Sequence, residues 1–283
     1  MIRRPIQSFR RYLLDRMVLQ PTRHPIDFAP MQREVLEFEC KPLECFVQKN
    51  YQSDEPPELL VLKFPGTAGR AERSTEFPIG QLPNLRCTTW TWNPPGYGGS
   101  VGRSSLSRIA DASIEFWRQV VQREAGSDTC IWLCGNSLGC VSAMNVATIV
   151  PNDSHRTGTL LRNPPPLAEV VKRVAARYPL GSLMGPVADS LMSSMDVMQT
   201  ASKITMPAVF LQSELDELVP VNMQDEVIKK YAGPHQVVLM EGLSHGGVAT
   251  DFHAEAIESS IEWLWEQTSR LPNESTSAKH RKH

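Results

Sequence analysis

Six short apolar segments recur along the chain, separated by polar stretches or by residues with helical periodicity. They are LLVLKF (59–64), CTTWTW (87–92), TCIWLC (129–134), TGTLLR (157–162), AVFLQS (208–213) and QVVLME (236–241). Most are continuously apolar rather than alternating, which is typical of strands covered on both faces. Strands that alternate with helices form a mostly parallel sheet with helices on both sides. The sequence therefore predicts an α/β fold.

The other elements complete this picture. Segments 33–40 and 43–50 are predicted to form an antiparallel pair with a tight turn at Lys41 and Pro42, which gives a sheet of about eight strands. Helical periodicity links Ile109, Ser113, Phe116 and Val120, then Ile257, Ile261 and Leu264, and also Leu191, Met195 and Met198. A chain of 283 residues is compatible with one domain of this class, which we expect over residues 20–268.

Residues 1–19 form a predicted amphipathic helix. Ile2, Ile6, Phe9 and Leu13 share one face, and five arginines surround it. Two interpretations are open: the helix lies on an anionic membrane surface through residues 1–20, or its apolar face docks on the protein. Docking is favoured because such faces usually serve a core. At the other end, residues 269–283 are polar and basic and are predicted to be disordered.

The composition of the chain argues against several classes of protein. The formal net charge of −2 gives no electrostatic basis for binding nucleic acid. No window reaches the roughly 20 apolar residues of a spanning helix, and the first residues do not follow the pattern of a secretion signal. The six cysteines lack the C-x-x-C spacing of zinc or redox sites, so we expect reduced, buried thiols and no metal. These features favour a cytoplasmic protein.

The segment GNSLG (135–139) follows a predicted strand and precedes residues of helical composition. In this context G-x-S-x-G predicts a nucleophile elbow, whose small residues allow strand and helix to pack closely while the hydroxyl of Ser137 projects above the sheet. The alternative is a purely structural glycine turn.

A serine needs a base and a group that orients the base. His245, in GLSHGG after the last strand, is the preferred base, because the other six histidines lie in connections, in the C-terminal residues or on a helix. Asp216 is the preferred acid in the segment after 208–213, and Glu217 is the alternative.

Acyl transfer also needs two backbone donors for the oxyanion. We expect these from Leu138, directly after the serine, and from Thr67 in the glycine-rich segment 65–69. The same segment could instead bind phosphate, but it lacks both the G-K-[ST] ending and the GxGxxG spacing.

Together, GNSLG, NPPGYGGSVG (93–102), DELVP (216–220) and GLSHGG (242–247) resemble the α/β-hydrolase family, in its small esterase and serine-aminopeptidase-like branch. The resemblance covers residues 20–267. It implies the α/β-hydrolase fold, with at most a small cap within 163–207. One departure concerns Pro65 and Gly66, which stand where relatives carry His-Gly before the oxyanion donor.

The resemblance implies a serine hydrolase that cleaves a carboxylic ester, thioester or amide of a small molecule without a cofactor. Two alternatives are an acyltransferase with the same triad and a non-catalytic binding protein on this scaffold. Leu191, Met192, Met195 and Met198 could line an acyl pocket, although core packing is favoured. The sequence does not indicate an oligomeric state.

Overall fold

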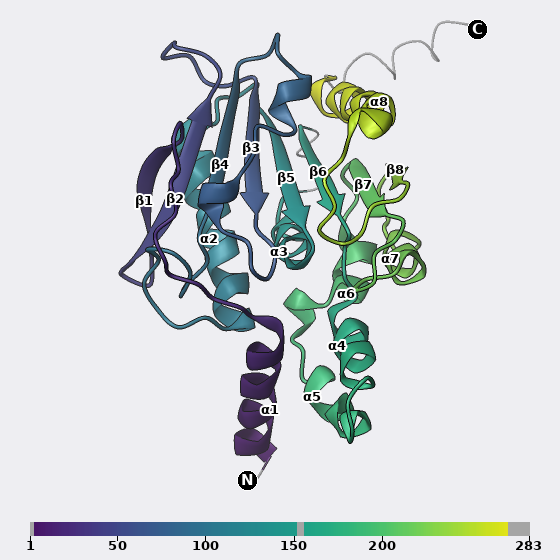
Figure 1. The fold of residues 1–283 in the computed structure, drawn as a ribbon. Helices are drawn as coiled ribbons and strands as arrows, with labels where there is room; N and C mark the ends of the chain where they lie inside the picture. The colour runs from purple at the N-terminus through teal and green to yellow at the C-terminus, as the bar shows by residue number, and fades with distance from the viewer. Residues whose placement is uncertain (1–2, 152–155, 271–283) are drawn as a thin grey trace, which may run out of the picture.

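Eight strands form one mostly parallel sheet at the centre of the molecule (Figure 1). The computed structural model describes residues 3–151 and 156–270. The strands are β1 (Gln32–Phe38), β2 (Lys41–Lys49), β3 (Leu59–Phe64), β4 (Cys87–Trp92), β5 (Cys130–Asn136), β6 (Thr157–Arg162), β7 (Ala208–Ser213) and β8 (His235–Met240). Their order is β1-β2-β4-β3-β5-β6-β7-β8, and only β2 runs antiparallel to its neighbours. The predicted α/β sheet is confirmed.

The turn of the β1–β2 hairpin differs from the prediction. Its tip is formed by Glu39 and Cys40, whose φ angles are +50° and +57°, and not by Lys41 and Pro42. Lys41 already pairs with Phe38 across the hairpin. Proline is tolerated in β2 because the stretch paired with β4 begins only at Cys45, beyond the proline.

Helices cover both faces of the sheet because successive strand residues point to opposite sides. The helices that pack on the two faces include α2 (Leu106–Glu124), α3 (Leu138–Ala147), α7 (Val221–Ile228) and α8 (Asp251–Ser269). In β3, Leu60 and Leu62 belong to an apolar cluster with α2, α3 and α7, whereas Leu59 and Val61 belong to a second cluster with α8. The predicted apolar faces of α2 and α8 are buried in these clusters.

The connection from β3 to β4, residues 65–86, contains no α-helix. It holds only two 3-10 turns, η1 (Ala71–Arg73) and η2 (Ile79–Gln81). Parallel strands are usually joined by a helix that covers the sheet. Here the thinner connection leaves a cavity against β3 and β5.

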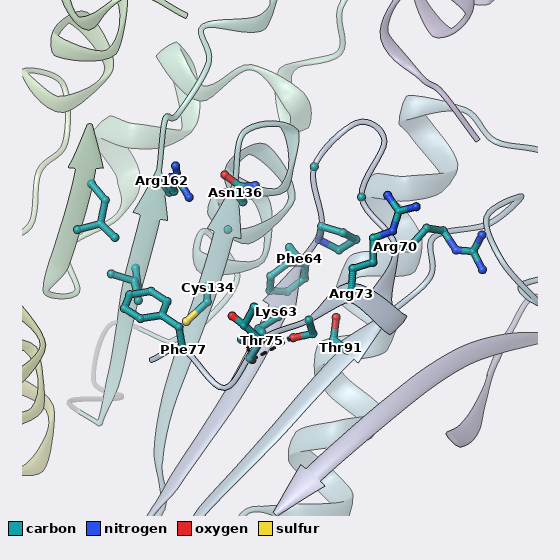
Figure 2. A pocket seen from close by; sticks show the side chains of 17 residues that line it. Lys63, Phe64, Arg70, Arg73, Thr75, Phe77, Thr91, Cys134, Asn136 and Arg162 are labelled. Atoms are coloured by element: carbon teal, nitrogen blue, oxygen red, sulfur yellow. Dashed lines mark hydrogen bonds between the residues drawn. The ribbon is translucent and has the colours of Figure 1, made fainter. Parts of the chain in front are cut away.

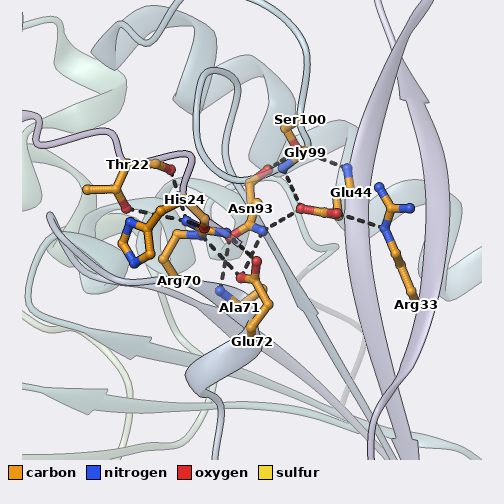
Figure 3. Close-up of polar contacts among 10 residues, drawn as sticks. All are labelled: Thr22, His24, Arg33, Glu44, Arg70, Ala71, Glu72, Asn93, Gly99 and Ser100. Atoms are coloured by element: carbon orange, nitrogen blue, oxygen red, sulfur yellow. Dashed lines mark hydrogen bonds and ion pairs between the residues drawn. The ribbon is translucent and has the colours of Figure 1, made fainter. Parts of the chain in front are cut away.

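A buried polar network holds this connection in place (Figure 3). Arg70 forms an ion pair with Glu72, and its Nη1 donates to two carbonyl oxygens of segment 22–24 at 3.1 Å each. Asn93, which follows β4, donates to Glu72 at 3.0 Å and to Glu44 of β2 at 2.8 Å. Buried polar groups are stable when each donor and acceptor has a hydrogen-bond partner. The network thereby ties the N-terminal segment, the connection and two strands together.

Glu44 accepts most of the remaining hydrogen bonds. Burial alone would raise the pKa of its carboxyl, but the N–H of Gly99, the amide of Asn93 and the guanidinium of Arg33 outweigh this, so the pKa is lowered. The Gly99 and Arg33 contacts measure 2.6 and 2.7 Å. Glu44 is therefore held as a carboxylate that fixes the loop after β4.

Residues 163–207, where at most a small cap was expected, contain α4 (Leu167–Ala175), α5 (Gly185–Ala188) and α6 (Val197–Thr200) among 3-10 turns. The helix predicted from Leu191, Met195 and Met198 is wrong. Asp196 caps the short α6 by accepting from the N–H of Met198 at 3.0 Å, so no continuous helix forms. These side chains nevertheless pack in or against the core, and Met195 is fully buried.

Helix α1 (Arg3–Val18) forms where the N-terminal helix was predicted, but it docks through a different face. Leu14 and Val18 are buried, whereas Ile6 and Phe9 are exposed, and Ile2 lies outside the described residues. The tail predicted to be disordered also lies outside them from residue 271 onward. Within residues 3–151 and 156–270, no helix is long and apolar enough to cross a membrane.

Candidate active site

Ser137 lies in a sharp turn between β5 and α3. Its φ of +52° and ψ of −122° are rarely adopted by a residue with a side chain. The flanking glycines make the turn possible: a Cβ at Gly135 would stand 2.5 Å from Cα of Cys140, and one at Gly139 would overlap the carbonyl oxygen of Phe64. Strand, turn and helix thus adopt the geometry expected of a nucleophile elbow.

The ring of His245 contacts both Ser137 and Asp216. Nδ1 lies 2.6 Å from Oδ2 of Asp216, and Nε2 lies 3.0 Å from Oγ of Ser137. Because a carboxylate only accepts hydrogen bonds, Nδ1 carries the hydrogen, and Nε2 of the neutral ring accepts from the serine hydroxyl. The structure therefore brings three residues that are far apart in sequence into one hydrogen-bonded chain.

Asp216 is buried in the loop after β7. Its Oδ1 accepts from the backbone N–H groups of Leu218 and Val219 at 2.9 and 2.7 Å, which leaves Oδ2 for His245. Glu217, the alternative from the sequence, is exposed, as is Glu214. The short loop aims one carboxylate inward and leaves its neighbours on the surface.

Two residues at the end of β6, which sequence reasoning missed, hold the histidine loop. Asn163, with φ of +52°, accepts from the N–H of Ser213 at 2.8 Å and donates to the carbonyl oxygen of His245 at 3.4 Å. Arg162 donates to the carbonyl oxygen of Gly247. The available signal was a polar pair directly after a buried strand, followed by three prolines.

The two candidate oxyanion donors border the same cavity as Ser137. Neither the N–H of Thr67 nor that of Leu138 has an acceptor among the described residues. The carbonyl of Thr67 accepts from the hydroxyl of Tyr97 at 2.8 Å, and this contact fixes the orientation of the loop. Their role as oxyanion donors stays a prediction.

The cavity at Ser137 has a volume of about 470 Å³. Its walls are mainly apolar and come from the end of α1, from α4 and from the loops after β3 and β7; examples are Met17, Leu138, Val170 and Val219. No aspartate, glutamate, lysine or arginine is among the described residues that line it. An uncharged, apolar group suits this space.

A second cavity, of about 330 Å³, lies beside the first (Figure 2). Lys63 lines it together with Arg70, Arg73 and Arg162, and its described lining contains no carboxylate. Burial lowers the pKa of Lys63 to about 8. Burial also raises the pKa of the nearby Cys134 thiol to about 12, so this cysteine is a neutral packing residue.

The strand order, the single antiparallel strand within it and the turn at Ser137 define the α/β-hydrolase fold, in agreement with the resemblance seen in the sequence. No protein-family model matches the chain, and no curated protein sequence does so. Solved structures with this fold match over most of the chain, and three serve as examples.

The Pyrococcus furiosus esterase Pf2001 is 14% identical over 89% of this chain and 98% of its own, with a TM-score of 0.63. Est1E from Butyrivibrio proteoclasticus, with ferulic acid bound, is 16% identical over 84% of this chain and 100% of its own, at 0.63. A puromycin-hydrolyzing peptidase from Mycobacterium tuberculosis is 13% identical over 88% of this chain and 41% of its own, at 0.62. At these identities the likeness concerns the fold.

Proposed function

We propose that the protein is a serine hydrolase that cleaves an uncharged carboxylic ester. The proposal rests on the position of the His245 ring, which is within hydrogen-bond distance of both Ser137 and Asp216. A serine hydroxyl is a weak nucleophile unless such a base takes its proton. The esterases among the structures of similar fold support the proposal.

In the proposed reaction, Oγ of Ser137 attacks the ester carbonyl while Nε2 of His245 takes its proton. Asp216 stays ionised, holds the ring tautomer and stabilises the imidazolium. The negative oxygen that develops on the carbonyl accepts hydrogen bonds from Thr67 and Leu138. His245 then protonates the leaving alcohol, and water releases the acyl group by the same steps.

The cavity supports an apolar acyl group as substrate. Its volume is within the range of small-molecule sites, and its lining offers no charged side chain to pair with a charged substrate. An ionised group placed there would lose its hydration without a partner. We therefore expect neutral esters to be hydrolysed faster than esters with a charged acyl group of equal size.

A fluorophosphonate probe, combined with hydrolysis of p-nitrophenyl esters, tests the proposal. We expect the probe to label Ser137, and we expect the Ser137→Ala variant to lose labelling and about 10⁶-fold in kcat while keeping its melting temperature. Product analysis with added alcohols separates hydrolysis from acyl transfer. Undiminished ester hydrolysis by purified Ser137→Ala would show that another group is the nucleophile.

A further inference from the structure

Helix α1 carries an apolar stripe whose N-terminal half, Ile6 and Phe9, is exposed. Ile6, Phe9, Leu13 and Met17 are spaced three and four residues apart and so share one face. Phe9 is 60% exposed and Leu13 is half-buried, whereas the docked face of the helix is formed by Leu14 and Val18. A helix attached through one apolar face thus presents a second apolar face to the surroundings.

The turn between α4 and α5 lies at the same end of the molecule as the start of α1 (Figure 1). Leu180 is 78% exposed and Leu183 is 68% exposed, and the ring of Tyr178 precedes them. Arg11 of α1 donates to the carbonyl oxygen of Ser190 after α5, so the two elements are held together. Their exposed apolar groups therefore lie on one projecting end rather than at scattered sites.

Both segments that carry these apolar groups have an excess of basic residues. Segment 1–19 contains five arginines and one aspartate, while the whole chain has a net charge of −2. Residues 173–188 contain Arg173 and Arg177 and no acidic residue. The acid of the neighbouring turn, Asp189, is paired with Lys172 at 2.8 Å. The projecting end is basic on a chain whose remaining residues carry excess negative charge.

The same elements lead to the candidate active site. Met17, the last member of the exposed stripe, lines the cavity at Ser137, and so do Val170 and Val174 of α4. Helices α1 and α4 therefore contribute both to this end of the molecule and to the wall of the cavity at Ser137.

We propose that this end of the protein docks on an anionic lipid bilayer. Its apolar groups are Ile6, Phe9, Tyr178, Leu180 and Leu183, and its exposed arginines include Arg10, Arg16 and Arg173. Exposed apolar groups enter the interface between headgroups and acyl chains, and arginines pair with anionic headgroups. Charge complementarity selects this occupant over a second copy of the chain, whose identical end would bring like charges together. Docking does not depend on the proposed hydrolase activity.

Vesicle flotation of the full chain tests the proposal. We expect the protein to float with vesicles of phosphatidylcholine mixed with phosphatidylserine, and to float much less with phosphatidylcholine alone or at high salt. Phe9→Asp combined with Leu180→Asp should lower the partition coefficient by about 100-fold, because each loses an apolar anchor. Arg10→Glu combined with Arg16→Glu should abolish the preference for the anionic lipid.

Phe252→Asp is the matched control. Phe252 is 75% exposed, but it belongs to α8, which lies at the opposite end of the molecule (Figure 1). It should float like the unmodified protein, and circular dichroism should show that all variants are folded. Three outcomes would overturn the proposal: no flotation with anionic vesicles, an equal loss in Phe252→Asp, or a dimer that the Phe9 and Leu180 substitutions dissociate while neither form floats.

Discussion

Two cavities lie side by side at the carboxyl edge of the sheet and differ in chemistry. They share Gly66, Gly69 and Asn136 in their walls. The larger cavity contains Ser137 and His245, and no aspartate, glutamate, lysine or arginine is among the described residues that line it. The smaller one contains Lys63 and three arginines. The candidate catalytic residues therefore lie in the cavity with fewer charged side chains.

The comparison shows that the candidate site depends on how the backbone positions its side chains, and not on how many reactive side chains a cavity contains. In the larger cavity a strained turn aims Ser137 at a base, and a buried carboxylate behind the base fixes its tautomer. In the smaller one Lys63 bonds to Ser74 and Thr75, which are neutral oxygen acceptors, and Cys134 stays a thiol. Nucleophile and base are paired only in the first.

Among the substitutions that compare the two cavities, the largest effect should come from Asp216, the carboxylate buried behind the base of the larger cavity. In Asp216→Asn, the amide oxygen would keep accepting from Leu218 and Val219, so the amide NH₂ would face Nδ1 of His245. The ring would then carry its hydrogen on Nε2 and could not take a proton from Ser137. We expect kcat for p-nitrophenyl esters to fall by about 10⁴-fold with little change in stability.

Glu217→Gln is the control for this substitution, because it removes an exposed carboxylate one residue away. We expect its kcat to equal that of the unmodified protein. If Glu217→Gln lost as much activity as Asp216→Asn, the acid would be misassigned. A smaller loss in Asp216→Asn, of only a few fold, would also contradict the proposed role.

The next effect concerns the contact between the elbow and the end of β3. In Gly139→Ala the new Cβ would overlap the carbonyl oxygen of Phe64, so the end of β3 and the elbow must move apart. We expect a loss of about 3 kcal/mol in unfolding free energy, seen as a melting temperature lower by roughly 10 °C.

Gly80→Ala provides the comparison, because no atom lies within 4 Å of a Cβ at that position. Its melting temperature should change by no more than about 2 °C. Equal melting temperatures for the two variants would mean that β3 and the elbow are not in close contact.

Much of this arrangement could be predicted from local sequence. The predicted bounds of β3, β4, β6 and β7 agree with the structure to the residue. A strand that is buried on both faces has few polar positions, so its run of residues in the sequence begins and ends with the strand. The residues brought together at the elbow were selected because each directly follows a strand, where parallel sheets collect their functional groups. Both inferences need only neighbours in sequence.

What could not be predicted depends on tertiary contacts. The docked face of α1 is set by the surface that receives Leu14, and the helical pattern alone favoured the face of Ile6 and Phe9. Asn163 acquires its role only when β6, β7 and the histidine loop meet. The second cavity exists because residues 65–86 lack an α-helix. Their sequence shows no helical periodicity, but this does not predict that a cavity forms between the connection and the sheet.

The smallest effect should be the pH dependence of stability that comes from Lys63, a residue that lines only the smaller cavity. Its pKa in the folded protein, about 8, is below the usual value of 10.5 because burial disfavours the ammonium ion. The unfolded chain therefore binds more protons than the folded one between about pH 8 and 10.5, and stability gains from this residue as pH rises through that window. Below pH 8 the full cost, about 3 kcal/mol, is present.

Lys63→Met removes the charge and keeps an apolar chain of similar length. Urea unfolding should show the variant to be more stable than the unmodified protein at pH 7, with an advantage that shrinks by roughly 2 kcal/mol at pH 10. Ester hydrolysis should persist, because Lys63 lines only the smaller cavity. A stability difference independent of pH would mean that the lysine is well solvated, and loss of hydrolysis would mean that the two cavities act as one site.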